Sequence, residues 1–515
     1  MKILKLIFVL YKIKLLSPLG LYRLLAAISK NGINIMTLLQ IAKGTYGNKV
    51  ALVDDNETIS YNQLFSQSEK LSMVLLEKYG LRCGQKVGFL CKNHASLVRS
   101  IFAVSRLGAD IYLLNPEMSK NQFKSQLEKH HFDFLVYDPE LRTIIEHANY
   151  TKEMVMSYHD HLPAINQLMT TNLIKEIKLH RTSMGKIMLL TGGTTGKSKE
   201  APHKLSLFNY LNPFVSLLVR LKLIKYNPVY IATPIYHGYG VAVLFLFIAL
   251  GEKVVISKGF HAQKACQLIR EHKVQVVTVV PLMIHKMLKH NAEDLKSLAC
   301  IASGGAQLNP KLADEVFHKL GNVLCNLYGT SETGLNIIAA PQDLKYSVHT
   351  IGKRINGVRL KVLDQNKDEV EFDTIGQFCV KSKWSFKNRK ASWIETGDLG
   401  YCDQNGYYFL CGRKDDMVVS AGENVYPIEL EQVLIQHNLI EDVAVIGMND
   451  EQFGQRLKAF VKPMRHANLT EEEIFEWLRP RVARFQVPKE IVFIDQMPYT
   501  PLGKLDKKRL KNMEG

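Results

Sequence analysis

Apolar and polar residues alternate along the chain in short blocks, and this pattern predicts strands separated by helices. Most of the apolar runs are followed by helical periodicity, and Ser60 is placed to cap one of these helices. Strands that alternate with helices form parallel sheets covered by helices, with ligands at the carboxyl ends of the strands. The predicted strands are residues 50–53, 84–90 with a preceding turn, 187–190, 229–232, 253–256, 274–280 and 298–302.

The length and composition of the chain predict a globular protein with more than one domain. Its 515 residues are too many for one ordinary core, and 46% hydrophobic with 22% charged residues is typical of a globular chain. The eight cysteines show no CxxC spacing. This argues against a disulfide framework or a zinc site and favours reduced thiols in a cytoplasm.

Positive charge is concentrated at the start of the chain. The net charge is +17, and residues 1–53 contain eight Lys and Arg but no Asp or Glu. No basic run interleaved with aromatic residues occurs, so the charge does not indicate nucleic acid. The apolar run from Leu6 to Tyr11 is far shorter than the ~20 residues of a spanning helix, and no signal-peptide cleavage site follows it. Residues 1–16 therefore form either a basic amphipathic helix on an anionic membrane or a helix docked on the protein.

The segment after the strand at 187–190 has the composition of a phosphate-binding loop. Glycines let backbone N–H groups approach an anion, while hydroxyls add donors and lysines add charge. Gly196-Lys197-Ser198 fits the end of a Walker A motif, but Thr191 stands where that motif requires its first glycine. The candidate phosphate-binding residues are Thr191, Gly192, Gly193, Thr194, Thr195, Gly196 and Lys199.

A second motif, at residues 328–332, contains the residue types that bind a nucleotide and its metal. The ring of Tyr328 can stack on adenine, with Gly329 beside it. Ser331 can reach a phosphate, and Glu332 offers the hard oxygen ligand that Mg²⁺ prefers.

Three shorter segments add weaker signals. Asp398 follows a glycine and is placed to accept hydrogen bonds from ribose hydroxyls. Gly304 and Gly305 follow a strand, where a flat ring can lie against the backbone. His237 lies in an aromatic turn and suits either a proton donor or a flat wall, although a lone histidine is more often structural.

In this order, the motifs resemble those of the adenylate-forming superfamily, which comprises acyl-CoA synthetases, adenylation domains and luciferases. The phosphate loop of that superfamily is roughly Thr-Ser-Gly-Thr-Thr-Gly-x-Pro-Lys-Gly. The chain departs from it at Gly192, Ser198 and Glu200, and a carboxylate near a triphosphate is repulsive. The matching segments span roughly residues 45 to 510 and look most like those of a fatty acyl-CoA synthetase.

The resemblance implies a two-step reaction. A carboxylate attacks the α-phosphorus of Mg·ATP to give an acyl-adenylate, and coenzyme A then displaces AMP. Lys504 is then the lysine that bridges the carboxylate and the α-phosphate, and His237 closes the carboxylate site. The segment that contains Gly304 and Gly305 is expected to line the adenine and acyl pocket. Arg413 is expected to bind ribose or phosphate.

The resemblance also implies a mobile C-terminal lid. Asp415 is expected to be the hinge, and Gly422 is expected on the face presented to the thiol. The predicted fold is α/β, with a large N-terminal domain of parallel-rich sheets covered by helices and a small mobile α+β C-terminal domain. The expected divisions are residues 1–44, a basic apolar segment; 45–412, the domain that binds ATP and the acyl group; and 413–515, the lid.

The sequence leaves three functions open. The first is a fatty acyl-CoA ligase, favoured by the apolar residues 241–250 and by the apolar, basic N-terminus. The second is a ligase that loads an acyl, aryl or amino acid onto a carrier protein. The third is a non-catalytic, membrane-associated relative, suggested by Ser198 and Glu200 and opposed by the presence of Glu332, Asp398, Arg413 and Lys504. The expected location is the cytoplasm, with peripheral contact at the inner face of the membrane; the sequence predicts no oligomeric state.

Overall fold

The structure is a computed structural model, and it forms two compact units. It describes residues 11, 16–170, 177–183, 185–191, 199–203, 207–384, 393–420, 423–500 and 503–514, with the backbone alone at 190, 191, 199–203, 207–211 and 514. The first unit comprises residues 1–279, 283–302 and 383–388, and the second comprises 280–282, 303–382 and 389–515. Of the predicted N-terminal helix at 1–16, only Tyr11 and Leu16 lie within the described residues.

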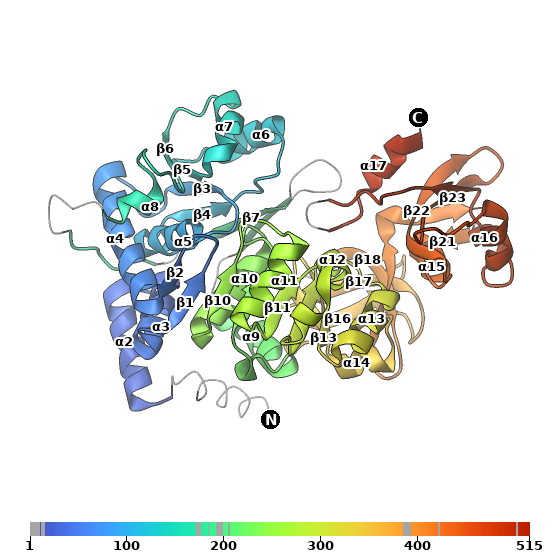
Figure 1. Cartoon of the computed structure of the whole chain (residues 1–515), viewed down its shortest axis with the longest axis horizontal. Coiled ribbons are helices and arrows are strands. Elements are labelled where there is room, and N and C mark those ends of the chain that lie inside the picture. The colour runs from blue at the N-terminus through green and yellow to red at the C-terminus, as the bar shows by residue number, and fades with distance from the viewer. Residues whose placement is uncertain are drawn as a thin grey trace. The chain divides into compact units, whose positions relative to one another are not determined.

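The first unit contains two largely parallel sheets flanked by helices, shown in blue to green in Figure 1. One sheet has the strand order β6-β5-β3-β4-β7-β8, and strands β2, β1, β10, β9, β11 and β12 follow one another in the other. The strands are β1 (Val50–Val53), β2 (Thr58–Ser60), β3 (Lys86–Leu90), β4 (Asp110–Leu113), β5 (Phe134–Tyr137), β6 (Glu153–Met156), β7 (Ile187–Thr191), β8 (Lys199–His203), β9 (Val229–Ile231), β10 (Val254–Ile256), β11 (Val276–Val279) and β12 (Cys300–Gly304).

Two helices of this part of the chain precede β1, and the others lie between successive strands, as parallel pairing requires. They are α2 (Pro18–Asn31), α3 (Ile35–Tyr46), α4 (Tyr61–Tyr79), α5 (Ala95–Leu107), α6 (Lys120–His130), α7 (Arg142–His147), α8 (Ile165–Leu168), α9 (Leu207–Arg220), α10 (Gly238–Leu250), α11 (Ala262–His272) and α12 (Pro281–Asn291). Ser60 caps α4 as predicted, because its side chain accepts a hydrogen bond from the Gln63 N–H while Gln63 bonds back to the Ser60 N–H.

Antiparallel pairing dominates the second unit. Strands β13, β14, β15, β19, β18, β17 and β16 follow one another in a sheet, and a smaller sheet has the order β21-β20-β23-β22 with β24 beside β23. The elements are α13 (Pro310–Leu320), β13 (Leu324–Thr330), β14 (Gly334–Ala339), α14 (Pro341–Tyr346), β15 (Thr350–Arg354), β16 (Arg359–Leu363), β17 (Gly376–Lys381), β18 (Ile394–Cys402), β19 (Tyr408–Arg413), β20 (Val418–Ser420), β21 (Glu423–Val425), α15 (Pro427–Leu434), β22 (Ile440–Asp450), β23 (Gly454–Pro463), α16 (Glu471–Leu478), β24 (Glu490–Phe493) and α17 (Lys507–Lys511).

The predicted fold class is confirmed. Parallel strands build the larger N-terminal part, and the C-terminal sheet with α15 and α16 is the small α+β domain. The core of that domain joins Leu430 and Leu434 of α15, Val445 of β22, and Ile474 and Leu478 of α16. The expected domain boundary at residue 413 stays a prediction.

Candidate functional site

Tyr328, Asp398 and Arg413 meet in the second unit, although they lie far apart in the sequence. The Tyr328 hydroxyl donates to Asp398 Oδ2 at 2.6 Å, and Arg413 Nη1 donates to Asp398 Oδ1 at 2.8 Å. The register of β18 and β19 places Asp398 directly opposite Arg413. The sequence motifs that contain these residues therefore form one constellation.

The Asp398 carboxylate is 6% exposed and strongly paired. Burial raises its pKa above the usual value of an aspartate, although Tyr328, Arg413 and Lys504 all oppose this shift. For Arg413, burial alone would lower the pKa, but Asp398 outweighs it and the pKa is raised. A carboxylate has about four lone-pair directions, so Asp398 keeps acceptor capacity beyond its two side-chain partners.

Two glycines shape this site. Gly397 has φ +77°, and a Cβ there would lie 3.1 Å from Arg413 Nη2. Gly329 has no room for a side chain, because a Cβ would lie 2.3 Å from the Gly334 carbonyl oxygen. The close approach at Gly329 holds β13 and β14 in a tight hairpin whose turn contains Ser331 and Glu332.

Lys504 lies on a C-terminal loop, and its ammonium is within electrostatic range of Arg413, Asp398 and Glu332. The Lys504 carbonyl accepts from the Thr500 N–H at 2.7 Å, which closes the turn before α17. Although the residue as a whole is exposed, burial of its ammonium and the nearby Arg413 lower its pKa, while Asp398 and Glu332 oppose the shift. The predicted adenylation lysine thus lies near the predicted nucleotide ligands.

Glu332 fits the magnesium role predicted for it. It is half-buried in the hairpin turn, and its carboxylate contributes negative charge near Lys504. A carboxylate oxygen is the ligand type that Mg²⁺ prefers, and Mg²⁺ usually keeps several waters and substrate phosphates in its shell. One protein carboxylate beside a triphosphate is therefore a suitable donor set.

His237, Gly304 and Gly305 lie at the ends of elements, as predicted. His237 is the residue before α10, half-buried, with its ring 4.5 Å from the Tyr236 ring. Gly304 ends β12, and Gly305 follows with φ +82°. The roles of all three residues stay predictions.

The predicted phosphate loop follows a strand, as expected, but it joins two antiparallel strands. Thr191 ends β7 and pairs with Lys199, the first residue of β8. Gly192, Gly193, Thr194, Thr195 and Gly196 lie outside the described residues, as does Gly422. The strands on either side of this segment are therefore antiparallel partners, and the next described helix, α9, begins only at Leu207.

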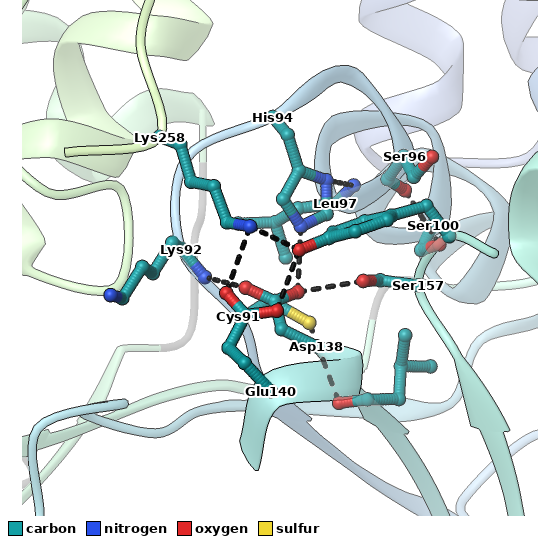
Figure 2. Close-up of polar contacts among 12 residues, drawn as sticks. Cys91, Lys92, His94, Ser96, Leu97, Ser100, Asp138, Glu140, Ser157 and Lys258 are labelled. Atoms are coloured by element: carbon teal, nitrogen blue, oxygen red, sulfur yellow. Dashed lines mark hydrogen bonds and ion pairs between the residues drawn. The ribbon is translucent and has the colours of Figure 1, made fainter. Parts of the chain in front are cut away.

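The structure also brings together Cys91, His94 and Asp138, a cluster that no sequence motif predicted. Their sulfur, nitrogen and carboxylate atoms lie within 4.8 Å of one another and all three residues are buried. Figure 2 shows the Asp138 carboxylate receiving hydrogen bonds from His94, Ser157 and the Lys92 backbone. The cluster follows β3 and β5, which are neighbours in the six-stranded sheet.

The hydrogen bonds of His94 identify this cluster as structural. The Leu97 N–H donates to His94 Nδ1 at 3.1 Å, so the ring proton is on Nε2, which donates to Asp138 Oδ1 at 2.8 Å. Neither ring nitrogen then offers a lone pair to a metal. Cys91 donates to the Val136 carbonyl at 3.5 Å, and burial raises the pKa of its thiol, which disfavours the thiolate that a metal requires.

Comparison with known families extends over most of the chain. The model of the AMP-binding enzyme family matches residues 39–388, and that of the AMP-binding enzyme C-terminal domain matches residues 429–504. The chain belongs to the AMP-binding enzyme family. Within that family it is an AMP-forming acid–thiol ligase.

Curated relatives and solved structures give the same assignment. The 2-succinylbenzoate–CoA ligase of Bacillus pumilus is 28% identical over 90% of this chain and 95% of its own length, and that of Bacillus subtilis is 26% identical over the same shares. The o-succinylbenzoate CoA synthetase structure from Bacillus subtilis, in complex with its acyl-adenylate intermediate, has a TM-score of 0.79 at 25% identity, covering 92% of this chain and 97% of that one. These findings confirm the predicted superfamily and the acid–CoA ligase chemistry. The relatives' names concern 2-succinylbenzoate rather than a fatty acid.

Proposed function

We propose that this AMP-forming ligase activates an aromatic acid of the 2-succinylbenzoate type and transfers it to coenzyme A. The single observation that carries the catalytic assignment is the Asp398 constellation, with the ammonium of Lys504 in electrostatic range of it. ATP, Mg²⁺ and coenzyme A are the cofactors.

The reaction balances in two steps. A carboxylate oxygen of the acid bonds to the α-phosphorus of ATP, and the bond to the leaving pyrophosphate breaks. The sulfur of coenzyme A then bonds to the acyl carbon, AMP leaves, and the thiol proton passes to solvent. A carboxylate is already ionised at neutral pH, so positioning and charge stabilisation dominate catalysis over any general base.

The residues of the second unit fit the binding of adenosine. Asp398, held by Tyr328 and Arg413, has acceptor capacity left for ribose hydroxyls. Glu332 would hold Mg²⁺, which when bound neutralises phosphate charge. Lys504 carries a compact positive charge toward the atoms where negative charge develops.

The names of the relatives support the acid substrate. Eight curated relatives, at 26–28% identity, are all 2-succinylbenzoate–CoA ligases. A solved structure of the Bacillus subtilis enzyme contains ATP and magnesium ion, and it covers 92% of this chain and 99% of its own chain at 25% identity, with a TM-score of 0.78.

A fatty acid is the second candidate, because α10 is almost wholly apolar. Most of its side chains are buried, and Phe245 packs on Phe102 with ring centroids 6.0 Å apart. This burial supports a core role for α10 more than a tunnel wall. Peripheral location at the inner face of the membrane also stays a proposal.

Pyrophosphate release, measured with and without coenzyme A, tests the substrate proposal. We expect 2-succinylbenzoate to give release by itself and a thioester only when coenzyme A is added, and an Asp398→Ala variant to give neither. Faster turnover of a fatty acid would replace the proposed substrate with the second candidate. Thioester formation on a carrier protein but not on coenzyme A would contradict the proposed acceptor, and no pyrophosphate release with any carboxylate would contradict the ligase assignment.

A further inference from the structure

Large apolar side chains that face solvent are concentrated at the start of the described chain. Leu19, Leu21, Tyr22 and Leu25 of α2 are 55%, 47%, 69% and 67% exposed. We call these four side chains the α2 outer face. Exposed apolar residues that occur singly are ordinary, but four on one short helix are not.

α2 is a well-defined helix that presents its apolar side to solvent. The Ser17 side chain caps its start by accepting from the Gly20 N–H at 3.0 Å, and Gly32 ends it with φ +85°. Spacings of three and four residues place Leu21, Tyr22 and Leu25 on one side, while Gly20, Ala27 and Asn31 are buried. A surface helix normally buries its apolar side, so this arrangement is the reverse of the usual one.

The positive charge of the N-terminal segment that contains α2 favours an anionic surface over a second copy of the chain as the binding partner. Residues 1–53 carry eight basic residues and no acid, and Arg23 and Lys30 lie on α2 itself. The carboxylate of Glu69 reaches this region, but it pairs with Lys30 at 2.7 Å. A second copy of the chain would bring two acid-free basic segments together, which is repulsive. An anionic surface is attracted instead.

We propose that the α2 outer face binds the surface of an anionic phospholipid bilayer, with the helix lying in the plane of the interface. Apolar side chains with flanking cations and no acids are the composition of such helices. α2 has 14 residues, about 21 Å at 1.5 Å per residue, so it is too short for a ~30 Å hydrocarbon core. Among the described helices, none is both long and apolar enough to cross a membrane.

The α2 outer face shares no residue with the predicted catalytic machinery. α2 precedes residue 39, where the family match begins, and none of the predicted site residues lies on it. The test of the α2 proposal is therefore independent of the identity of the acid substrate.

Flotation of the full chain with vesicles tests the proposal. Vesicles of phosphatidylcholine containing phosphatidylglycerol should bind the protein in low salt, and vesicles of phosphatidylcholine alone should bind it far less. The Leu21→Ser/Leu25→Ser variant should lose about tenfold or more in partitioning. Phe372→Ser removes a side chain that is 61% exposed in the second unit, and it should leave binding unchanged.

A variant that lacks residues 1–16 separates α2 from the segment before it. If the shortened variant still binds vesicles in part, and the Leu21→Ser/Leu25→Ser change abolishes this binding, the result would support the α2 outer face as the membrane-binding surface. Loss of all binding on deletion, with no effect of the α2 substitutions in the full chain, would overturn the proposal. It would also be overturned by a dimer that the substitutions dissociate while no vesicle binding is seen. Circular dichroism and adenylation activity equal to those of the parent chain show that each variant is folded.

Discussion

The ammonium of Lys504 lies among charges of both signs, and this balance decides when it is protonated. Burial and Arg413 lower its pKa, whereas Asp398 and Glu332 raise it, and the net direction is downward. The charged form exists below the pKa. An adenylation rate that depends on this charge therefore falls as pH rises, at a lower pH than for an ordinary lysine.

Replacement of Lys504 by alanine should abolish adenylation far more than thioester formation. The loss of one charged group that stabilises the transition state costs about 10²- to 10³-fold in rate. Pyrophosphate release reports the first half-reaction, and thioester formation from supplied acyl-adenylate reports the second. Lys508→Ala, which removes an exposed lysine four residues away, is the matched control. Equal loss of both half-reactions in Lys504→Ala would assign the lysine another role.

At the residue scale, the motifs predicted which side chains would gather, but not how they bond. Tyr328 was expected to offer its ring to adenine, and the structure adds a hydroxyl bond to Asp398, 70 residues away. Such a bond depends on the register of β13, β18 and β19, which no local pattern encodes. His94 was not predicted because its role depends on Asp138 and on the N–H of Leu97, which only the fold brings to it.

At the scale of elements, buried apolar strands were predictable and a paired polar strand was not. Residues 50–53 form β1 as expected, because a continuous apolar run suits a strand buried in a parallel sheet. The segment 199–203 has no strand periodicity, and it forms β8 by antiparallel pairing with β7. Pairing with a partner strand here overrides local propensity.

The end of α10 carries a buried carboxylate that should make stability depend on pH. Glu252 is 9% exposed and its Oε2 has no hydrogen-bond partner among the described residues, while the Tyr61 hydroxyl donates to its backbone oxygen at 2.9 Å. Burial raises its pKa from 4.5 to about 7, and Lys49 opposes the shift. Because burial raises the pKa of Glu252 in the folded state, the neutral carboxyl is the form that the fold favours. The free energy of unfolding is therefore highest below the pKa of the unfolded state and falls as pH rises through about 7.

We expect Glu252→Gln to stabilise the first unit at alkaline pH, by roughly 3 kcal/mol at most, and to change little at about pH 4. The amide cannot ionise, so the cost of a buried charge disappears. Thermal unfolding of both forms across this pH range measures the difference. Glu128→Gln, at an exposed position on α6, is the control that should show no such dependence. A gain that is the same at every pH would mean that packing, and not ionisation, is responsible.

At the scale of the whole molecule, the predicted reaction needs a C-terminal domain that serves two half-reactions in turn. The described arrangement places Lys504 within electrostatic range of Asp398, Arg413 and Glu332, which agrees with the adenylation role predicted for it. Thioester formation is expected to need a different orientation, with Gly422 toward the thiol. The order of the motifs predicted the C-terminal lid from sequence. Local sequence patterns do not predict how far this lid rotates, because its two orientations differ in contacts between segments that are distant in the sequence.

If Asp415 is the hinge, fixing its backbone should impair one half-reaction more than the other. Asp415 lies exposed in the middle of the single 3₁₀ turn Lys414–Asp416, between β19 and β20. Residues in such a turn have φ near −60°, which is close to the value that proline imposes. Asp415→Pro should therefore keep the described arrangement and resist the rotation away from it. Adenylation should remain within about threefold of the parent enzyme, while thioester formation from supplied acyl-adenylate should fall by about tenfold or more. Asp415→Ala removes the same carboxylate without fixing φ, so it should keep both half-reactions. A folded proline variant that retains both rates would show that the rotation takes place at another residue.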